Sequence, residues 1–182
     1  MTAPTGAVSR RAPRQAQRGL FLIEALIAIL IISLGILGMI AMGGVAVSAQ
    51  SDAQYRTEAQ ANAEAIAAAI SLRADRNGSE ASLAASLQAF QHRPTPGECK
   101  DTFTAPKTAD PEVLALTERF ANQVPGVPGM VGASDVHQRV LVDVDPLNGH
   151  NRVTVTLCWR APSDSALRQH TFVTYVNGTK NP

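Results

Sequence analysis

The sequence LFLIEALIAILIISLGILGMIAMGGVAV, residues 20–47, decides the fold of this chain. It contains no proline and a single charged residue, Glu24. About 20 apolar residues at 1.5 Å each cross the ~30 Å hydrocarbon layer of a bilayer, and a helix satisfies all its own backbone groups there. We therefore expect a transmembrane helix. A carboxylate in mid-membrane costs roughly 2.5–3.5 kcal/mol, and less near a helix end, so Glu24 should still favour a partner.

The residues before this stretch contain a recognisable processing signal. Gln17-Arg18-Gly19 precedes Leu20, and Glu24 follows the glycine by five positions. A basic leader, a glycine and a glutamate at this spacing in an apolar helix closely resemble the processing site of type IV prepilins. In that family a membrane peptidase cuts after the glycine and methylates the new amino terminus. The resemblance implies cleavage between Gly19 and Leu20 and methylation of Leu20, where the family usually has phenylalanine.

A second string narrows the resemblance within that family. Residues 32–39, ISLGILGM, look like the minor pilin subfamily PilV, the type IV pilus modification proteins. The resemblance implies that Glu24 meets the amine of an adjacent subunit during filament assembly. An unpaired charge in lipid that seeks an opposite charge would give direction and register to helix association.

Two other interpretations of residues 20–47 remain open. The stretch could be a simple membrane anchor that tolerates a glutamate near its end. It could also be a secretory signal cleaved before Gln50, because Val47-Ser48-Ala49 offers small residues there. Secretory apolar cores run 7–15 residues, however, and this one is about twice as long and carries a charge.

Charge predicts the orientation in the membrane. Residues 1–19 carry four arginines and no acid, which places the N-terminus in the cytoplasm. Without these four arginines the chain has 12 basic and 15 acidic residues, which gives a net charge of −3. The pilin resemblance then implies a single-pass protein of a bacterial inner membrane with a periplasmic head, later incorporated into the pilus or its tip. We expect no nucleic-acid partner, because the whole chain has a net charge of +1 and no basic stripe.

The rest of the chain is expected to continue the helix and then fold into a head. We assign residues 1–19 to a removed leader, 20–47 to the transmembrane helix, 48–74 to an amphipathic helix and 75–182 to the head. The segment 48–74 is rich in alanine, and its apolar residues recur at spacings of three and four. This stripe comprises Tyr55, Ala59, Ala63, Ile66 and Ile70.

Local signals predict two short helices and three strands in the head. Ser79 should cap a helix over 80–90, and Asp110 should cap a helix that begins with Pro111. Alternating apolar residues predict strands at 139–144, 152–160 and 170–176, joined by short links in an antiparallel meander. The expected fold is α+β, a long N-terminal helix packed on a small antiparallel sheet, with Trp159 in the core.

The two cysteines, Cys99 and Cys158, should be oxidised to each other in an exported head. Such a bridge would pin the proline-rich segment 94–97 to the middle strand. The alternative is two free thiols in a reducing compartment, which the predicted orientation disfavours.

Motifs for catalysis are absent from the sequence. It contains no GxGxxG, phosphate loop, HExxH or GxSxG, and its four histidines are at spacings unlike those of metal ligands. We expect no enzymatic role and no cofactor. The leading hypothesis is a minor pilin whose partners are other major and minor pilins, the prepilin peptidase, the inner-membrane assembly platform and the lipid bilayer. The alternatives are a minor pseudopilin of type II secretion and a membrane-anchored periplasmic binding domain or enzyme.

Overall fold

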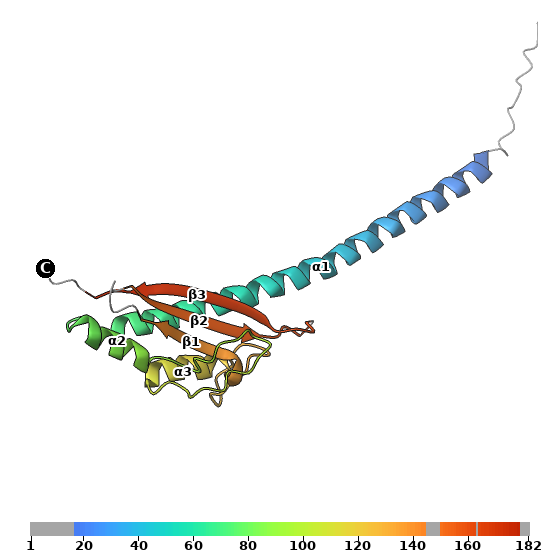
Figure 1. Cartoon of the computed structure of the whole chain (residues 1–182). Coiled ribbons are helices and arrows are strands. Elements are labelled where there is room, and N and C mark those ends of the chain that lie inside the picture. Colours follow the sequence, from blue (N-terminus) through green and yellow to red (C-terminus); the bar gives the residue numbers. More distant parts are fainter. Residues whose placement is uncertain (1–16, 145–149, 163, 179–182) are drawn as a thin grey trace, which may run out of the picture. The chain divides into compact units, whose positions relative to one another are not determined.

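The computed structural model describes residues 17–144, 150–162 and 164–178, and it has the expected α+β fold (Figure 1). Helix α1 spans Gln17–Arg73, and helices α2 (Glu80–Ala89) and α3 (Pro111–Phe120) follow it. A 3-10 turn η1 (Asp135–His137) leads into strands β1 (Gln138–Asp143), β2 (Asn151–Trp159) and β3 (Arg168–Val176). The chain divides into two compact units, Met1–Ala49 and Gln50–Pro182, and α1 contributes to both.

The predicted caps begin α2 and α3. The Ser79 side chain accepts a hydrogen bond from the Ser82 amide, and the Asp110 carboxylate accepts from the amides of Glu112 and Val113. Each cap satisfies amides that have no partner within the helix, which fixes where the helix starts. Both helices therefore begin at the residue that the sequence predicts.

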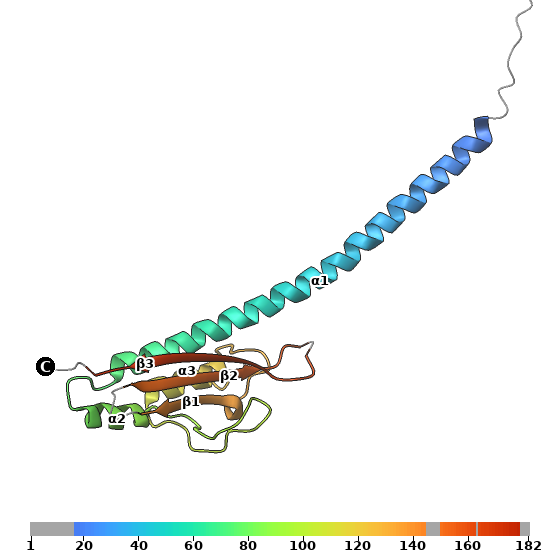
Figure 2. The ribbon, with the colours of Figure 1, turned by 45° about the horizontal axis from the view of Figure 1, so that its top comes forward.

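The three strands form the predicted antiparallel meander in the order β1-β2-β3 (Figures 1 and 2). Strand β3 begins at Arg168, two residues before its predicted start. Along β2 the residues alternate between the two faces of the sheet, as a strand requires. Val153, Val155, Leu157 and Trp159 are all at most 1% exposed on the inner face, so Trp159 lies in the core as expected.

The inner face of the sheet packs against the second half of α1. The predicted stripe supplies Ala59, Ala63, Ile66 and Ile70, all fully buried, and half-buried Tyr55 packs beside them. Leucines of α2 and Val113 and Phe120 of α3 complete this core. The small alanines allow helix and sheet to approach closely, and the isoleucines fill the space between them.

The outer face of the sheet is partly covered by the segment that carries Cys99. Cys99 and Cys158 form a disulfide with their Cα atoms 5.8 Å apart. Phe103 is fully buried beside them, and the Arg139 guanidinium lies 4.9 Å from the centre of its ring. Arg139 also donates to the carbonyls of Thr95 and Gly97, which holds the covering segment to β1. The disulfide therefore anchors a second, smaller core on the other side of the sheet.

Candidate functional site

The residues of the predicted processing site lie at the start of α1. Gly19, Leu20 and Glu24 are all helical and exposed, and a side-chain carbon added at Gly19 would meet no atom within 4 Å. The Leu20 side chain is 71% exposed. No described residue forms a hydrogen bond or ion pair with Glu24. In the protomer the peptide bond and the carboxylate are thus both accessible, and Glu24 remains available to an outside partner.

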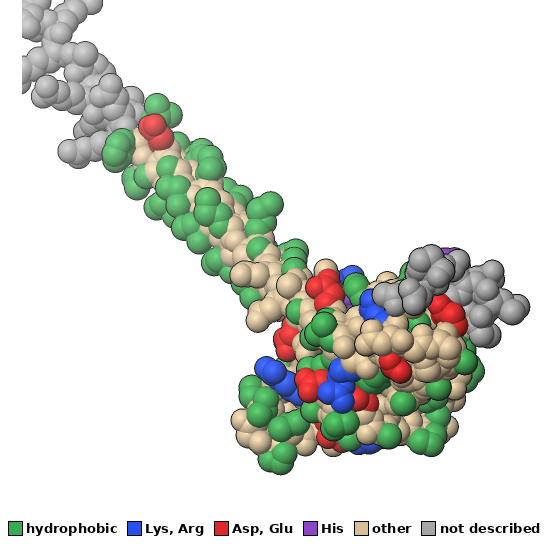
Figure 3. All heavy atoms as spheres, turned by 90° about the vertical axis from the view of Figure 1, so that its left-hand side faces the viewer, with side chains coloured by type: hydrophobic (Ala, Val, Ile, Leu, Met, Phe, Trp, Pro, Cys, Tyr) green, Lys and Arg blue, Asp and Glu red, His purple; other side chains and the backbone are tan. Residues whose placement is uncertain are grey.

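The stretch from Leu20 to Val47 is apolar on all sides. Its large hydrophobic residues are between 52% and 77% exposed, and Figure 3 shows hydrophobic side chains projecting all along the visible face of this part of α1. By length and composition α1 can cross a membrane once. The Ser33 hydroxyl donates to the Ile29 carbonyl at 2.7 Å, so this polar group is satisfied within the helix. Glu24 is therefore the polar side chain in this stretch that still needs a partner.

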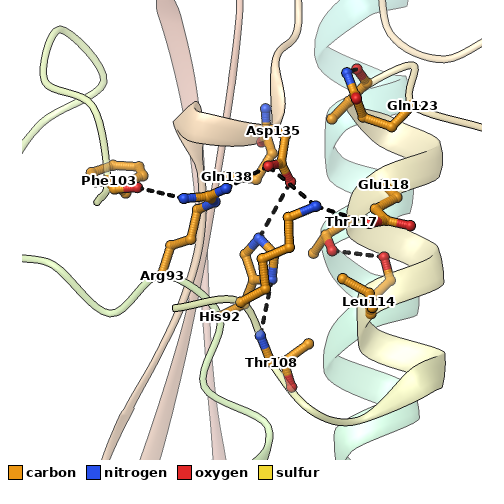
Figure 4. Close-up of polar contacts among 12 residues, drawn as sticks. His92, Arg93, Phe103, Thr108, Leu114, Thr117, Glu118, Gln123, Asp135 and Gln138 are labelled. Atoms are coloured by element: carbon orange, nitrogen blue, oxygen red, sulfur yellow. Dashed lines mark hydrogen bonds and ion pairs between the residues drawn. The ribbon is translucent and has the colours of Figure 1, made fainter. Parts of the chain in front are cut away.

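A second polar group lies inside the head and involves residues that the sequence did not single out. His92 is fully buried, and its Nδ1 accepts a hydrogen bond from the Thr108 amide at 3.4 Å (Figure 4). Its Nε2 faces the Asp135 carboxylate at 3.9 Å. Burial lowers the pKa of His92 to about 4, outweighing the opposite effect of Asp135. His92 is therefore neutral at physiological pH.

Asp135 is the centre of this cluster. Arg93 donates to its Oδ2 at 2.6 Å, and Lys107 lies 3.3 Å from the same oxygen (Figure 4). Burial opposes ionisation of the carboxylate, but the hydrogen bond and charge of Arg93, together with Lys107, prevail and lower the pKa of Asp135. Lys107 also pairs with Glu118 at 2.9 Å. Two acids and two bases thus balance one another and tie η1, α3 and the segment after α2 together.

This cluster is suited to holding the head together rather than to chemistry. The imidazole of His92 has no exposed surface, so a substrate cannot reach it. His92 and Asp135 are separated by 43 positions in the sequence, and no motif connects them. The proline-rich segment 94–97 follows His92 and Arg93 directly, but prolines signal a turn rather than a buried ion-pair cluster.

A shallow cleft at the end of the sheet contains a serine beside a histidine. The Ser134 hydroxyl and the His137 Nδ1 lie 3.2 Å apart, and Arg160 and Asp164 also line the cleft. The carboxylate of Asp164 is bonded by Arg168. It therefore does not orient the imidazole as the third member of a catalytic triad would. Burial, aided by the charge of Arg160, lowers the pKa of His137.

Within the described residues, no group of three or more histidine, cysteine, aspartate or glutamate side chains is arranged to hold a metal ion. Comparison of the chain with family models, with curated proteins and with solved structures found no match.

Proposed function

We propose that this chain is a minor pilin of the type IV pilus, similar to the PilV subfamily. The observation that carries the proposal is Glu24. It is the one charged side chain in residues 20–47, it follows Gly19 by five positions, and no described residue pairs with it. A membrane anchor alone has no use for such a carboxylate, whereas a neighbouring subunit with a free terminal amine supplies its partner.

In this proposal, maturation creates the charge that Glu24 needs. Prepilin peptidase cleaves between Gly19 and Leu20 and methylates the new amine, which is positively charged at neutral pH. The chain spans the bacterial inner membrane once, with its N-terminus in the cytoplasm and its head in the periplasm. Pairing of Glu24 with an adjacent subunit then sets the register of the apolar helices as the assembly platform moves subunits into the filament.

The proposal assigns no enzymatic activity and no cofactor to the chain. The ISLGILGM string at residues 32–39 favours the pilus over a type II secretion pseudopilus, and the head supplies the surface that contacts other pilins. The arginines of the leader support the orientation because basic residues are retained on the cytoplasmic side.

The first test is mass spectrometry of the protein extracted from membranes of the native host. We expect an N-terminus at Leu20 carrying one methyl group. The variant Gly19→Arg should remain at full length, and Gly35→Ala, a glycine change inside the helix, should be processed normally. A mature N-terminus at Met1 or at Gln50 would refute the assignment.

The second test addresses the carboxylate. Glu24→Gln keeps the size of the side chain and removes its charge, so membrane insertion should persist while incorporation into sheared pili is lost. Glu58→Gln, an exposed glutamate later in the same helix, is the matched control and should assemble normally. Normal incorporation of the Glu24→Gln variant would contradict the pairing role.

A further inference from the structure

The two edge strands of the sheet differ in whether the backbone groups on their outer side are hydrogen-bonded. On β1, the outer edge is paired, because His92 and Val140 exchange backbone hydrogen bonds of 3.0 and 2.9 Å. On β3, the described residues make no backbone hydrogen bonds to the outer edge, and β2 is the only strand paired with it. Strand β3 is nine residues long and contains neither proline nor lysine, the residues that commonly protect an exposed edge.

The register identifies which backbone groups of β3 point outward. Val140 bonds to His92, so its amide and carbonyl point away from β2, and Val140 and Val155 form a non-hydrogen-bonded pair. The backbone groups of Val155 therefore point towards β3 and bond to Phe172, its partner in the register. By alternation along β3, the free amides and carbonyls belong to Gln169, Thr171, Val173 and Tyr175.

The side chains of β3 are more exposed than those of β2, as expected for a strand with no neighbour on one side. The inner-face residues of β2 are fully buried, whereas those of β3 from Arg168 to Thr174 are only half-buried. Phe172 packs against the core from this position. On the outer face Val173 is 46% exposed and Tyr175 is 59% exposed. One more strand beside β3 would cover the half-buried side chains on the inner face and the exposed side chains on the outer face.

We propose that the free edge of β3 binds an extended strand from another polypeptide. Only an extended chain offers amides and carbonyls at the spacing of Gln169, Thr171, Val173 and Tyr175. Its inward side chains must be apolar to cover Phe172, and its outward ones should be β-branched or aromatic to contact Val173 and Tyr175. It must lack proline at the positions whose amides face β3.

A second copy of this chain fits the edge less well than such a strand. Paired antiparallel about Phe172, its β3 would place Arg168, His170 and Thr174 on the inner side of the sheet, where apolar side chains are needed to cover the core. This preference and the free edge do not depend on the proposed function.

The test uses the full chain in detergent micelles and a fluorescent, end-capped peptide, VQVTFVVYV, as the probe. The peptide is a copy of β3 in which valine replaces Arg168, His170 and Thr174, so it can pair antiparallel about Phe172 with an apolar side chain at every inward position. Fluorescence anisotropy should show saturable binding. Val173→Pro removes an outward amide without removing a bond to β2, so it should weaken binding about tenfold or more. Val173→Thr retains the amide and should bind within about threefold of the unmodified chain.

A change in the probe keeps the test independent of how the variants fold. Methylation of the peptide amides equivalent to Gln169, Thr171, Val173 and Tyr175 should abolish binding, while methylation of those equivalent to His170, Phe172 and Thr174 should not. Equal binding of the two methylated peptides, or no binding of the unmodified peptide, would overturn the proposal. A dimer of the full chain that Val173→Pro dissociates would overturn the assignment to another polypeptide. Glu24→Gln should bind the probe normally, so failure of pilus assembly and failure of edge binding are distinguishable.

Discussion

The buried imidazole of His92 should make the head less stable in mild acid. The pKa of this residue falls from 6.5 to about 4 on folding, so between these values the unfolded chain binds a proton that the folded chain does not. Stability is therefore lost as the pH falls from about 6.5 towards 4. Between pH 7.5 and pH 4.5 we expect His92 to contribute a loss of about 2.5 kcal/mol in the free energy of unfolding.

Urea unfolding of the full chain in detergent measures this loss. Trp159 is the single tryptophan and is buried in the sheet, so its fluorescence reports on unfolding of the head. Other carboxylates also titrate near the lower pH, and a comparison with His92→Asn removes their contribution. Asparagine can still accept the hydrogen bond from Thr108 but does not titrate. Asp135 has a lowered pKa, so its stabilising contribution is lost only at still lower pH.

The decisive quantity is the difference between the unmodified chain and His92→Asn in the free energy of unfolding lost over this pH range. The unmodified chain should lose about 2.5 kcal/mol more than His92→Asn over this pH range. His150→Asn, at an exposed histidine, is the control and should follow the unmodified chain. If His92→Asn shows the same pH dependence as the unmodified chain, the neutral buried imidazole is not the cause and the reasoning fails.

Two further predictions concern the covalent and backbone constraints of the head. Replacing Cys99 and Cys158 together by serine opens the loop that the disulfide closes, whose ends are 59 positions apart in the sequence. Urea unfolding should then show a free energy of unfolding lower by about 4 kcal/mol. A loss below about 1 kcal/mol would contradict the loop-entropy explanation. Gly132→Ala should cost about 1–3 kcal/mol, because Gly132 has φ +67° and an added carbon would clash with the Arg160 carbonyl. Gly126→Ala, at φ +77° in open space, should cost less, and equal thermal shifts for the two glycine variants would argue against the clash.

Local chemistry made most of the fold predictable. Asp110, Pro111 and Glu112 together predict a helix start, and the alternation around Val155 predicts a strand. The spacing of the alanines and isoleucines before Arg73 predicts a buried helix face. Each of these features depends on residues within a few positions of one another, so it can be predicted from the sequence alone.

Long-range packing was not predictable in the same way. The ion pair of Arg93 with Asp135 joins residues 42 positions apart, and either side chain read alone is an ordinary solvated charge. The pairing of His92 with Val140 depends on where the segment after α2 crosses the sheet. Within the candidate site, Gly19, Leu20 and Glu24 could be named because their signal is local, whereas the free edge of β3 emerges only once the strand order is known.

The distribution of burial along α1 also determines where the chain can be divided to obtain a soluble fragment. Among the described residues of this helix, Ala59 is the first that is fully buried, so trimming before Gln50 removes the bilayer-compatible half without taking a side chain out of the head. A fragment that begins after Arg73 would lack Ala59, Ile66 and Ile70, and the inner face of the sheet would be exposed to water. The last 24 residues of α1 are thus part of the globular unit, and a secretable version for crystallisation or immunisation has to retain them.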